Sequence, residues 1–387
     1  MQVNFFKYLP IALLFVVFAC KKTENEATQQ PKLVSATLVK EYTKAELTAA
    51  LPQFAFLIKN GVQQYKIVYN TTNTDGTAIK ASGALIVPTG STDALPLMSY
   101  QHGTIFNDAD APSYLTITRG EGQTATFLAS LGYIISAPDY IGYGTSNNLP
   151  HPYEHREGLA TASLDMLRAA KEAITNQKIN WNNSLYIAGY SEGGFATMSL
   201  QKKIEETTGT EFTLKAASCG AGAYNKTLGF KTLAVTKSSG DATHNASYIW
   251  VLLTYDRIYK LNRPLNTYFI EPYAAQIETQ KQNARILGSF DGLLTANFKK
   301  GVTEGTDAAL LTAVADNDVF DWKPKTPTRL YHGDKDTYVP YFNSVTAADA
   351  MKKRGADVEF ITVPGGDHNG SVSNFFLGTL AFFESKK

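Results

Sequence analysis

Cysteine is scarce in this sequence. The 387 residues contain two, Cys20 and Cys219, which are too few for the disulfide framework of a small secreted scaffold. A charge surplus is also missing, since 36 Lys and Arg face 35 Asp and Glu, for a formal net charge of +1. Without a basic surplus, no nucleic acid is expected as a partner. The mean hydropathy of -0.18 excludes a protein that crosses a membrane many times.

The chain does have a large apolar content. Hydrophobic residues make up 44% and charged residues 18%, with 21 Tyr and 21 Phe. This composition supports a large core and excludes wholesale disorder. Length alone, at roughly 150 residues per domain, suggests two or three domains. The order of the segments along the chain instead favours one core with an insertion.

The first twenty residues have the pattern of an export signal. Lys7 precedes an apolar run over 8–19, which is too short to span a bilayer as a helix but suits the core of a signal peptide. The run ends at Cys20, in a context that resembles the lipobox of bacterial lipoproteins, where the cysteine is lipidated after cleavage. We therefore predict a signal peptide over 1–19, followed by a lipidated Cys20 and a flexible tether over 20–50.

This interpretation also predicts a location. Lys21 follows the cysteine, and this resembles the sorting signal of lipoproteins that reach the outer membrane. The expected protein is exported and lipid-anchored to the bacterial outer membrane, on its periplasmic or surface face. An ordinary secretory signal with an incidental cysteine is the alternative. The folded domain is expected over 51–387.

Short apolar runs alternate with amphipathic segments along this domain. Nearly unbroken apolar strands that alternate with helices are typical of an α/β fold, with a mostly parallel sheet covered by helices on both faces. The predicted strands are 65–69, 83–87, 96–100, 133–137, 185–189, 216–219, 329–332 and 358–363, and the predicted helices are 157–176, 193–204, 342–354 and 372–383.

Residues 222–327 interrupt the alternation with helical and aromatic segments. Strand-like runs resume after them, so we interpret this stretch as an insertion in one domain. Its aromatic side chains could line a pocket, although most of them are expected to form the insertion's own small core.

The most informative motif is G-x-S-x-G over 189–193, between a predicted strand and a predicted helix. This context is typical of a nucleophile elbow. The turn is so tight that side chains at Gly189 and Gly193 would collide with the backbone. Ser191 is expected at the start of a helix, where the helix dipole favours developing negative charge. We predict Ser191 as a nucleophile.

A nucleophilic serine needs a base, and the base needs an orienting carboxylate. After a nucleophile elbow the order along the chain is serine, acid, histidine. Of six histidines, only His368 follows the last strand that could carry the acid, in a glycine-rich loop. The acid is expected in the loop after 329–332. There Asp336, at the crest of the loop, is preferred to Asp334, which is expected to accept hydrogen bonds from its own turn amides.

Acyl transfer also needs N–H donors for the oxyanion of the tetrahedral intermediate. One is the backbone N–H of Glu192, directly after the nucleophile. The second is expected from the loop after strand 96–100, where Gly103 permits a turn that aims the N–H of Thr104 into the site. His102 is interpreted as a residue that shapes this loop.

Together these segments resemble the α/β-hydrolase superfamily, and within it the secretory-lipase-like esterases. The resemblance covers roughly residue 64 to the C-terminus. It implies hydrolysis of carboxylic esters by a serine, without a cofactor, and a lid formed by the insertion. The implied substrate is a small-molecule or glycan ester, such as an acylated carbohydrate or a short-chain glyceride. The segments that carry it are 100–104, 137–144, 151–153, 189–193, 332–340 and 364–370.

Two other functions fit the same residues. The machinery could cleave peptides, or a degenerate hydrolase fold could serve a surface lipoprotein that only binds a glycan or lipid. The complete set of catalytic residue types argues against the second. No Cys/His spacing predicts a metal site, and Gly220-Ala221-Gly222 lacks the third glycine of a dinucleotide-binding motif. The sequence makes no prediction of the oligomeric state.

Overall fold

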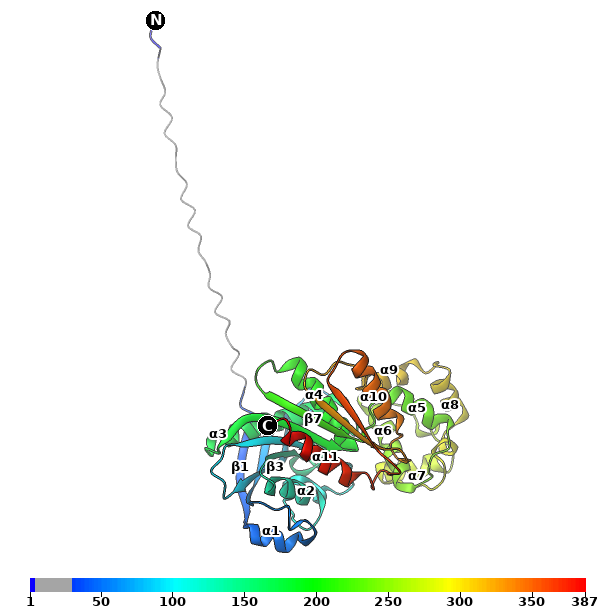
Figure 1. Ribbon diagram of the computed structural model, residues 1–387. Helices are drawn as coiled ribbons and strands as arrows, with labels where there is room; N and C mark the ends of the chain where they lie inside the picture. Colours follow the sequence, from blue (N-terminus) through cyan, green and yellow to red (C-terminus); the bar gives the residue numbers. More distant parts are fainter. Residues whose placement is uncertain (4–29) are drawn as a thin grey trace. The chain divides into compact units, whose positions relative to one another are not determined.

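A nine-stranded sheet forms the centre of the protein in a computed structural model that describes residues 1–3 and 30–387 (Figure 1). In spatial order the strands are β1 (Leu33–Tyr42), β2 (Gly61–Thr72), β3 (Ala78–Thr89), β5 (Ile134–Pro138), β4 (Leu95–Gln101), β6 (Trp181–Tyr190), β7 (Thr213–Gly220), β8 (Thr328–Gly333) and β9 (Val358–Val363). In this order, neighbours from β1 to β5 pair antiparallel, and neighbours from β5 to β9 pair parallel.

Helices cover both faces of the sheet. One face packs against α1 (Lys44–Ala50), α2 (Gly120–Ser130) and α11 (Val372–Glu384), and the other against α3 (Arg156–Asn176), α4 (Glu192–Thr207) and α10 (Phe342–Lys353). Along β6, Tyr186 packs on the face that α1, α2 and α11 cover, whereas Leu185 and Ile187 pack on the face that α3 and α4 cover. This alternation arises because successive strand residues point to opposite faces of the sheet. The predicted α/β architecture is confirmed.

The helices between β7 and β8 form the predicted insertion: α5 (Lys226–Val235), α6 (Ala242–Ile258), α7 (Tyr273–Gln280), α8 (Ala296–Thr303) and α9 (Ala308–Asp316). Figure 1 shows them gathered at one end of the sheet. They enclose an apolar cluster of their own, which includes Trp250, Tyr255, Tyr268 and Phe298. None of the helices within the described ranges combines the length and apolarity needed to cross a membrane.

The predicted tether over 20–50 is wrong in its C-terminal part. Residues 33–50 contain β1 and α1, and β1 pairs with β2 from Leu33 to Tyr42. Most β1 residues are exposed or half-buried because the strand lies at the edge of the sheet. It therefore has no apolar run that would predict it. Cys20 and most of the predicted signal peptide over 1–19 lie outside the described residues.

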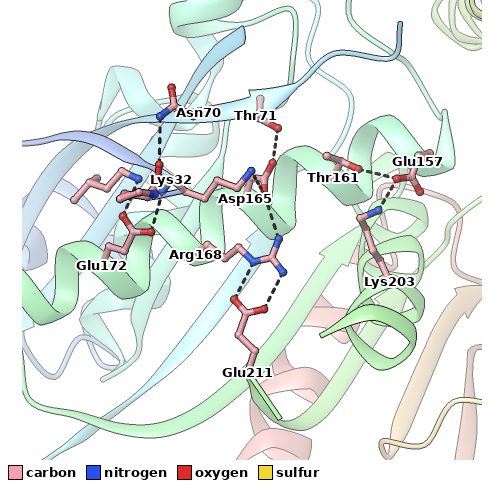
Figure 2. Close-up of polar contacts among 12 residues, drawn as sticks. Lys32, Asn70, Thr71, Glu157, Thr161, Asp165, Arg168, Glu172, Lys203 and Glu211 are labelled. Atoms are coloured by element: carbon pink, nitrogen blue, oxygen red, sulfur yellow. Dashed lines mark hydrogen bonds and ion pairs between the residues drawn. The ribbon is translucent and has the colours of Figure 1, made fainter. Parts of the chain in front are cut away.

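Polar contacts with α3 hold the start of β1, as Figure 2 shows. The backbone N–H groups of Lys32 and Leu33 donate to the two carboxylate oxygens of Glu172, each at 2.9 Å. The Lys32 ammonium lies 3.0 Å from the buried carboxylate of Asp165, which also accepts from the Thr71 hydroxyl at 2.9 Å. These contacts fix the chain to the domain from residue 32 onward.

Candidate active site

Ser191 occupies the turn between β6 and α4. Its backbone has φ 60° and ψ -125°, a strained conformation for a residue with a side chain. A Cβ at Gly189 would lie 2.3 Å from the carbonyl oxygen of Gly193, and one at Gly193 would lie 2.1 Å from that of Gln101. Neither distance is physically possible, so the tight turn requires both glycines, as the motif predicts.

Ser191, His368 and Asp336 form one hydrogen-bonded chain. Ser191 Oγ lies 2.9 Å from His368 Nε2, and His368 Nδ1 lies 2.6 Å from Asp336 Oδ2. When Nδ1 donates to the carboxylate, Nε2 is left as an acceptor for the serine proton, which is the tautomer that a general base needs. The fold thus brings together the three residues that the sequence places in separate loops.

The surroundings of Asp336 keep its carboxyl ionised. Oδ1 accepts from the backbone N–H groups of Tyr338 and Val339, each at 2.9 Å, and Oδ2 lies 3.2 Å from His332 Nε2. Burial raises the pKa of this carboxyl, but hydrogen bonds from His332 and His368 outweigh burial and hold the pKa below its usual range. Asp336 is therefore an anion at neutral pH.

Asp334 lies outside this chain of hydrogen bonds. Its Oδ1 accepts from the backbone N–H of Gly365 at 2.8 Å, so the prediction that it bonds to its own turn amides is wrong. Gly365 belongs to the loop that carries His368, which only the fold brings close to Asp334. The bond joins the loop of the acid to the loop of the base.

The loop after β4 lies against the elbow. A Cβ at Gly103 would lie 3.3 Å from the carbonyl oxygen of Tyr190 and 3.9 Å from the Cβ of Ser191. Within residues 30–387, neither the backbone N–H of Thr104 nor that of Glu192 donates a hydrogen bond to another group. Two N–H donors are therefore available on the segments that flank Ser191.

His102 shapes this loop, as its position suggested. Its ring nitrogens lie 2.7 Å from the carbonyl oxygen of Gly103 and 3.2 Å from that of Asp139. The backbone carbonyl of His102 accepts from the Tyr140 hydroxyl at 3.1 Å. The ring thus connects the end of β4 to the end of β5.

Known proteins resemble this chain in sequence and in fold. The model of the prolyl oligopeptidase family matches residues 298–383, the part that carries Asp336 and His368. A trichothecene C-3 esterase of Fusarium sporotrichioides is 23% identical over 352 residues, which are 84% of this chain and 75% of the fungal protein.

Two solved structures extend the comparison. A protein of Legionella pneumophila assigned as a hydrolase superposes with a TM-score of 0.82 and 26% identity, over 92% of this chain and 98% of that one. The rice cell wall degrading esterase LipA of Xanthomonas oryzae superposes with a TM-score of 0.78 and 25% identity, over 90% of this chain and 95% of its own. The chain has the α/β-hydrolase fold.

Sequence reasoning missed a partner of Glu192. Glu192 Oε1 lies 2.7 Å from Nε2 of His151, and both side chains are almost fully buried. His151 Nδ1 lies 2.7 Å from the carbonyl oxygen of Ile141, which can only accept, so Nδ1 carries a hydrogen. The contact between Nε2 and Oε1 joins the two side chains directly. It fixes the residue whose N–H flanks Ser191, and no spacing in the sequence links the two residues.

A cavity opens beside Ser191. It encloses about 820 Å³ of empty space, part of which is open solvent. The aromatic residues of the insertion that line it are Phe230, Tyr248, Phe290 and Phe298, whereas others, such as Tyr255 and Tyr268, lie in the insertion's own core. Most of the wall is apolar, and its main side chains are Phe230, Leu233, Val251, Leu252, Phe290, Leu294 and Phe298.

Two other features of the described residues bear on the chemistry. No group of three or more His, Cys, Asp and Glu in residues 1–3 and 30–387 is placed to hold a metal ion. Cys219 is buried in β7, and burial raises the pKa of its thiol, which is typical of a small buried residue.

Proposed function

We propose that this α/β-hydrolase cleaves carboxylic esters through an acyl-enzyme at Ser191. The observation that carries the proposal is the hydrogen-bonded chain from Ser191 through His368 to Asp336, beside two available N–H donors. The resemblance to a fungal esterase and to a bacterial cell wall degrading esterase supports ester hydrolysis.

The geometry suggests a two-step reaction. Ser191 Oγ attacks the ester carbonyl while His368 Nε2 takes the serine proton, and the N–H groups of Glu192 and Thr104 stabilise the oxyanion. As the intermediate collapses, His368 gives the proton to the departing alkoxide, and an acyl-serine remains. Water then attacks the acyl group with His368 as base, which releases the carboxylic acid and restores Ser191. Asp336 remains ionised and stabilises the imidazolium.

The cavity supports a substrate with a substantial apolar part. Its wall consists mainly of insertion side chains, and burial of an apolar group there contributes roughly 25 cal/mol per Å². We propose a small-molecule or glycan ester as substrate, such as an acylated carbohydrate or a short-chain glyceride, and no cofactor.

The variant Ser191→Ala tests this function. Because the three residues act as a unit, we expect kcat for p-nitrophenyl butyrate to fall by at least ~10³-fold. Ser91→Ala, on an exposed loop, is the matched control and should retain full activity. Wild-type turnover in a folded Ser191→Ala protein would refute the assignment. A wild-type protein that binds glycan or lipid but hydrolyses no ester would be a binding protein.

A serine peptidase is the second candidate, because a prolyl oligopeptidase family model matches residues 298–383. Ester and amide hydrolysis share the acyl-enzyme, so a p-nitrophenyl ester and a p-nitroanilide with the same acyl group separate the two functions. We expect the ester to have the higher kcat/KM. A higher kcat/KM for the anilide would identify a peptidase.

A further inference from the structure

One charged pair interrupts the apolar wall of the cavity. Glu154 and Lys226 line the cavity together with Ser191, and the Lys226 ammonium donates to Glu154 Oε2. Their side chains are 9% and 4% exposed, respectively. A charged pair is unusual in such a wall, because each charge loses water and the attraction between them only partly offsets that loss.

Three features indicate that stability does not account for this pair. Burial raises the pKa of Glu154 and lowers the pKa of Lys226, because desolvation disfavours both charges. Lys226 is the first residue of α5, where the positive end of the helix dipole disfavours a cation. Glu154 has φ 49°, a conformation that residues with a side chain rarely adopt.

The pair retains hydrogen-bonding capacity. Lys226 has three N–H donors, and within residues 30–387 it donates only to Glu154, while the ring of Phe195 lies 4.4 Å from its ammonium. The second carboxylate oxygen, Glu154 Oε1, accepts no hydrogen bond from any described residue. It is also not among the side-chain oxygen and nitrogen atoms that are both fully buried and unpaired. That oxygen therefore retains some exposed surface, on a residue that lines the cavity.

The chemistry of the pair selects a ligand group. A hydroxyl can accept from Lys226 and donate to Glu154 at the same time. A carboxylate would be repelled by Glu154 and an ammonium by Lys226, and an alkyl group would remove water from both charges without replacing its hydrogen bonds.

We infer that Glu154 and Lys226 form a hydroxyl-binding subsite, and that the preferred substrates are esters whose cavity-bound part is mainly apolar and carries a hydroxyl group. Hydroxyaryl and hydroxyalkanoyl esters have this character. The inference rests on the proposed ester hydrolysis and specifies the substrate class of the same site.

Pairs of esters that differ by one hydroxyl test the subsite. Suitable pairs are methyl 4-hydroxycinnamate with methyl cinnamate, methyl 3-hydroxyhexanoate with methyl hexanoate, and the monobutyrate of 1,6-hexanediol with hexyl butyrate. We expect the wild type to prefer the hydroxylated member of at least one pair by ~10-fold or more in kcat/KM, because a buried polar site rejects an analogue that leaves it unpaired.

The double variant Glu154→Gln/Lys226→Met removes both charges at similar volume, so neither remains buried alone. We expect it to lower the preference to near 1. The matched control is Glu278→Gln/Lys281→Met, which should keep the preference. It removes an exposed ion pair between Glu278 in α7 and Lys281, the residue that follows this helix. If the double variant does not fold, Lys226→Arg, with its different donor geometry, takes its place in the comparison.

Each outcome decides the inference. A preference that is equal in the wild type and the double variant, or a wild type that discriminates in no pair, would overturn it. If the wild type hydrolyses none of the esters, the proposed function fails instead. In that case, calorimetry of 4-hydroxycinnamate and cinnamate binding tests the subsite by itself. The wild type should bind 4-hydroxycinnamate more tightly than cinnamate, and the double variant should lose this preference.

Discussion

Ser191 adopts its strained backbone where the end of β4 lies against the start of α4. The carbonyl oxygen of Gln101 would lie 2.1 Å from a Cβ at Gly193 and 2.5 Å from one at Gly189. The motif predicts both glycines, because a tight strand-to-helix turn excludes side chains at these positions whatever lies around it. The pairing of Glu192 with His151 was not predictable, since it depends on a loop that only the folded chain brings to the elbow.

A methyl group at Gly193 tests the role of the turn. In Gly193→Ala the elbow must shift away from Gln101, which displaces both Ser191 and the N–H of Glu192. We expect kcat for p-nitrophenyl butyrate to fall by at least ~10²-fold, comparable with the loss of an oxyanion donor.

The control for this prediction is Gly292→Ala, where an added Cβ meets nothing within 4 Å. It should leave kcat unchanged. A Gly193→Ala protein with wild-type kcat would contradict the geometry of the elbow.

The elements that carry the site are the ones that the sequence predicts best. The nucleophile, the acid and the base follow β6, β8 and β9, each of which the sequence predicts as a strand. Neighbouring parallel strands end at the same edge of a sheet, so the order of the motifs indicates that the three residues meet. By contrast, β1 is a mostly exposed edge strand, and α2 begins with Gly120 and Gly122, so neither has a clear apolar pattern.

Helix α3 supplies a prediction about pH. His155 caps its N-terminus, and Nδ1 accepts from the backbone N–H of Gly158 at 3.1 Å, which requires the unprotonated nitrogen. Burial lowers the pKa of His155 from 6.5 to about 4. Because the folded state favours the neutral ring, the contribution of His155 to stability is complete above pH 6.5 and is lost as the pH falls toward 4. At pH 5 the loss is about 2 kcal/mol.

The matched variant is His155→Asn, since asparagine also caps a helix but does not titrate in this range. Urea unfolding at pH 7.5 and pH 5 should show that the wild type loses about 2 kcal/mol more of its unfolding free energy than the variant. Equal losses in the two proteins would contradict the assignment of His155 as a neutral cap.

At the scale of the whole molecule, length is a poor guide to the number of domains. Residues 31–387 form one compact unit, in which the insertion between β7 and β8 contributes its own apolar cluster. The interruption of the alternating strands and helices over 222–327 predicts the insertion, but it does not predict the cavity. Its wall depends on how α5, α6 and α8 come together beside Ser191, and local pattern does not determine that arrangement.

The N-terminus provides a prediction about location. We propose that the chain is exported and anchored to the outer membrane through lipid on Cys20, with a tether that ends where Glu172 binds the backbone of Lys32. In cells fed alkyne-palmitate, the wild type should carry label and fractionate with membranes. Cys20→Ala should lose both properties, and Cys219→Ala, at a buried residue, should keep them. Label that persists in Cys20→Ala would contradict the anchor.

The central claim is that Ser191 is the nucleophile of an esterase, and reaction with a fluorophosphonate probe tests it most directly. The probe forms a covalent bond with a serine only where a base activates the hydroxyl. Peptide mass spectrometry should find one adduct, on Ser191, and loss of p-nitrophenyl butyrate hydrolysis should follow the labelled fraction one to one. An adduct on another serine, or full hydrolysis by a fully labelled protein, would contradict the account.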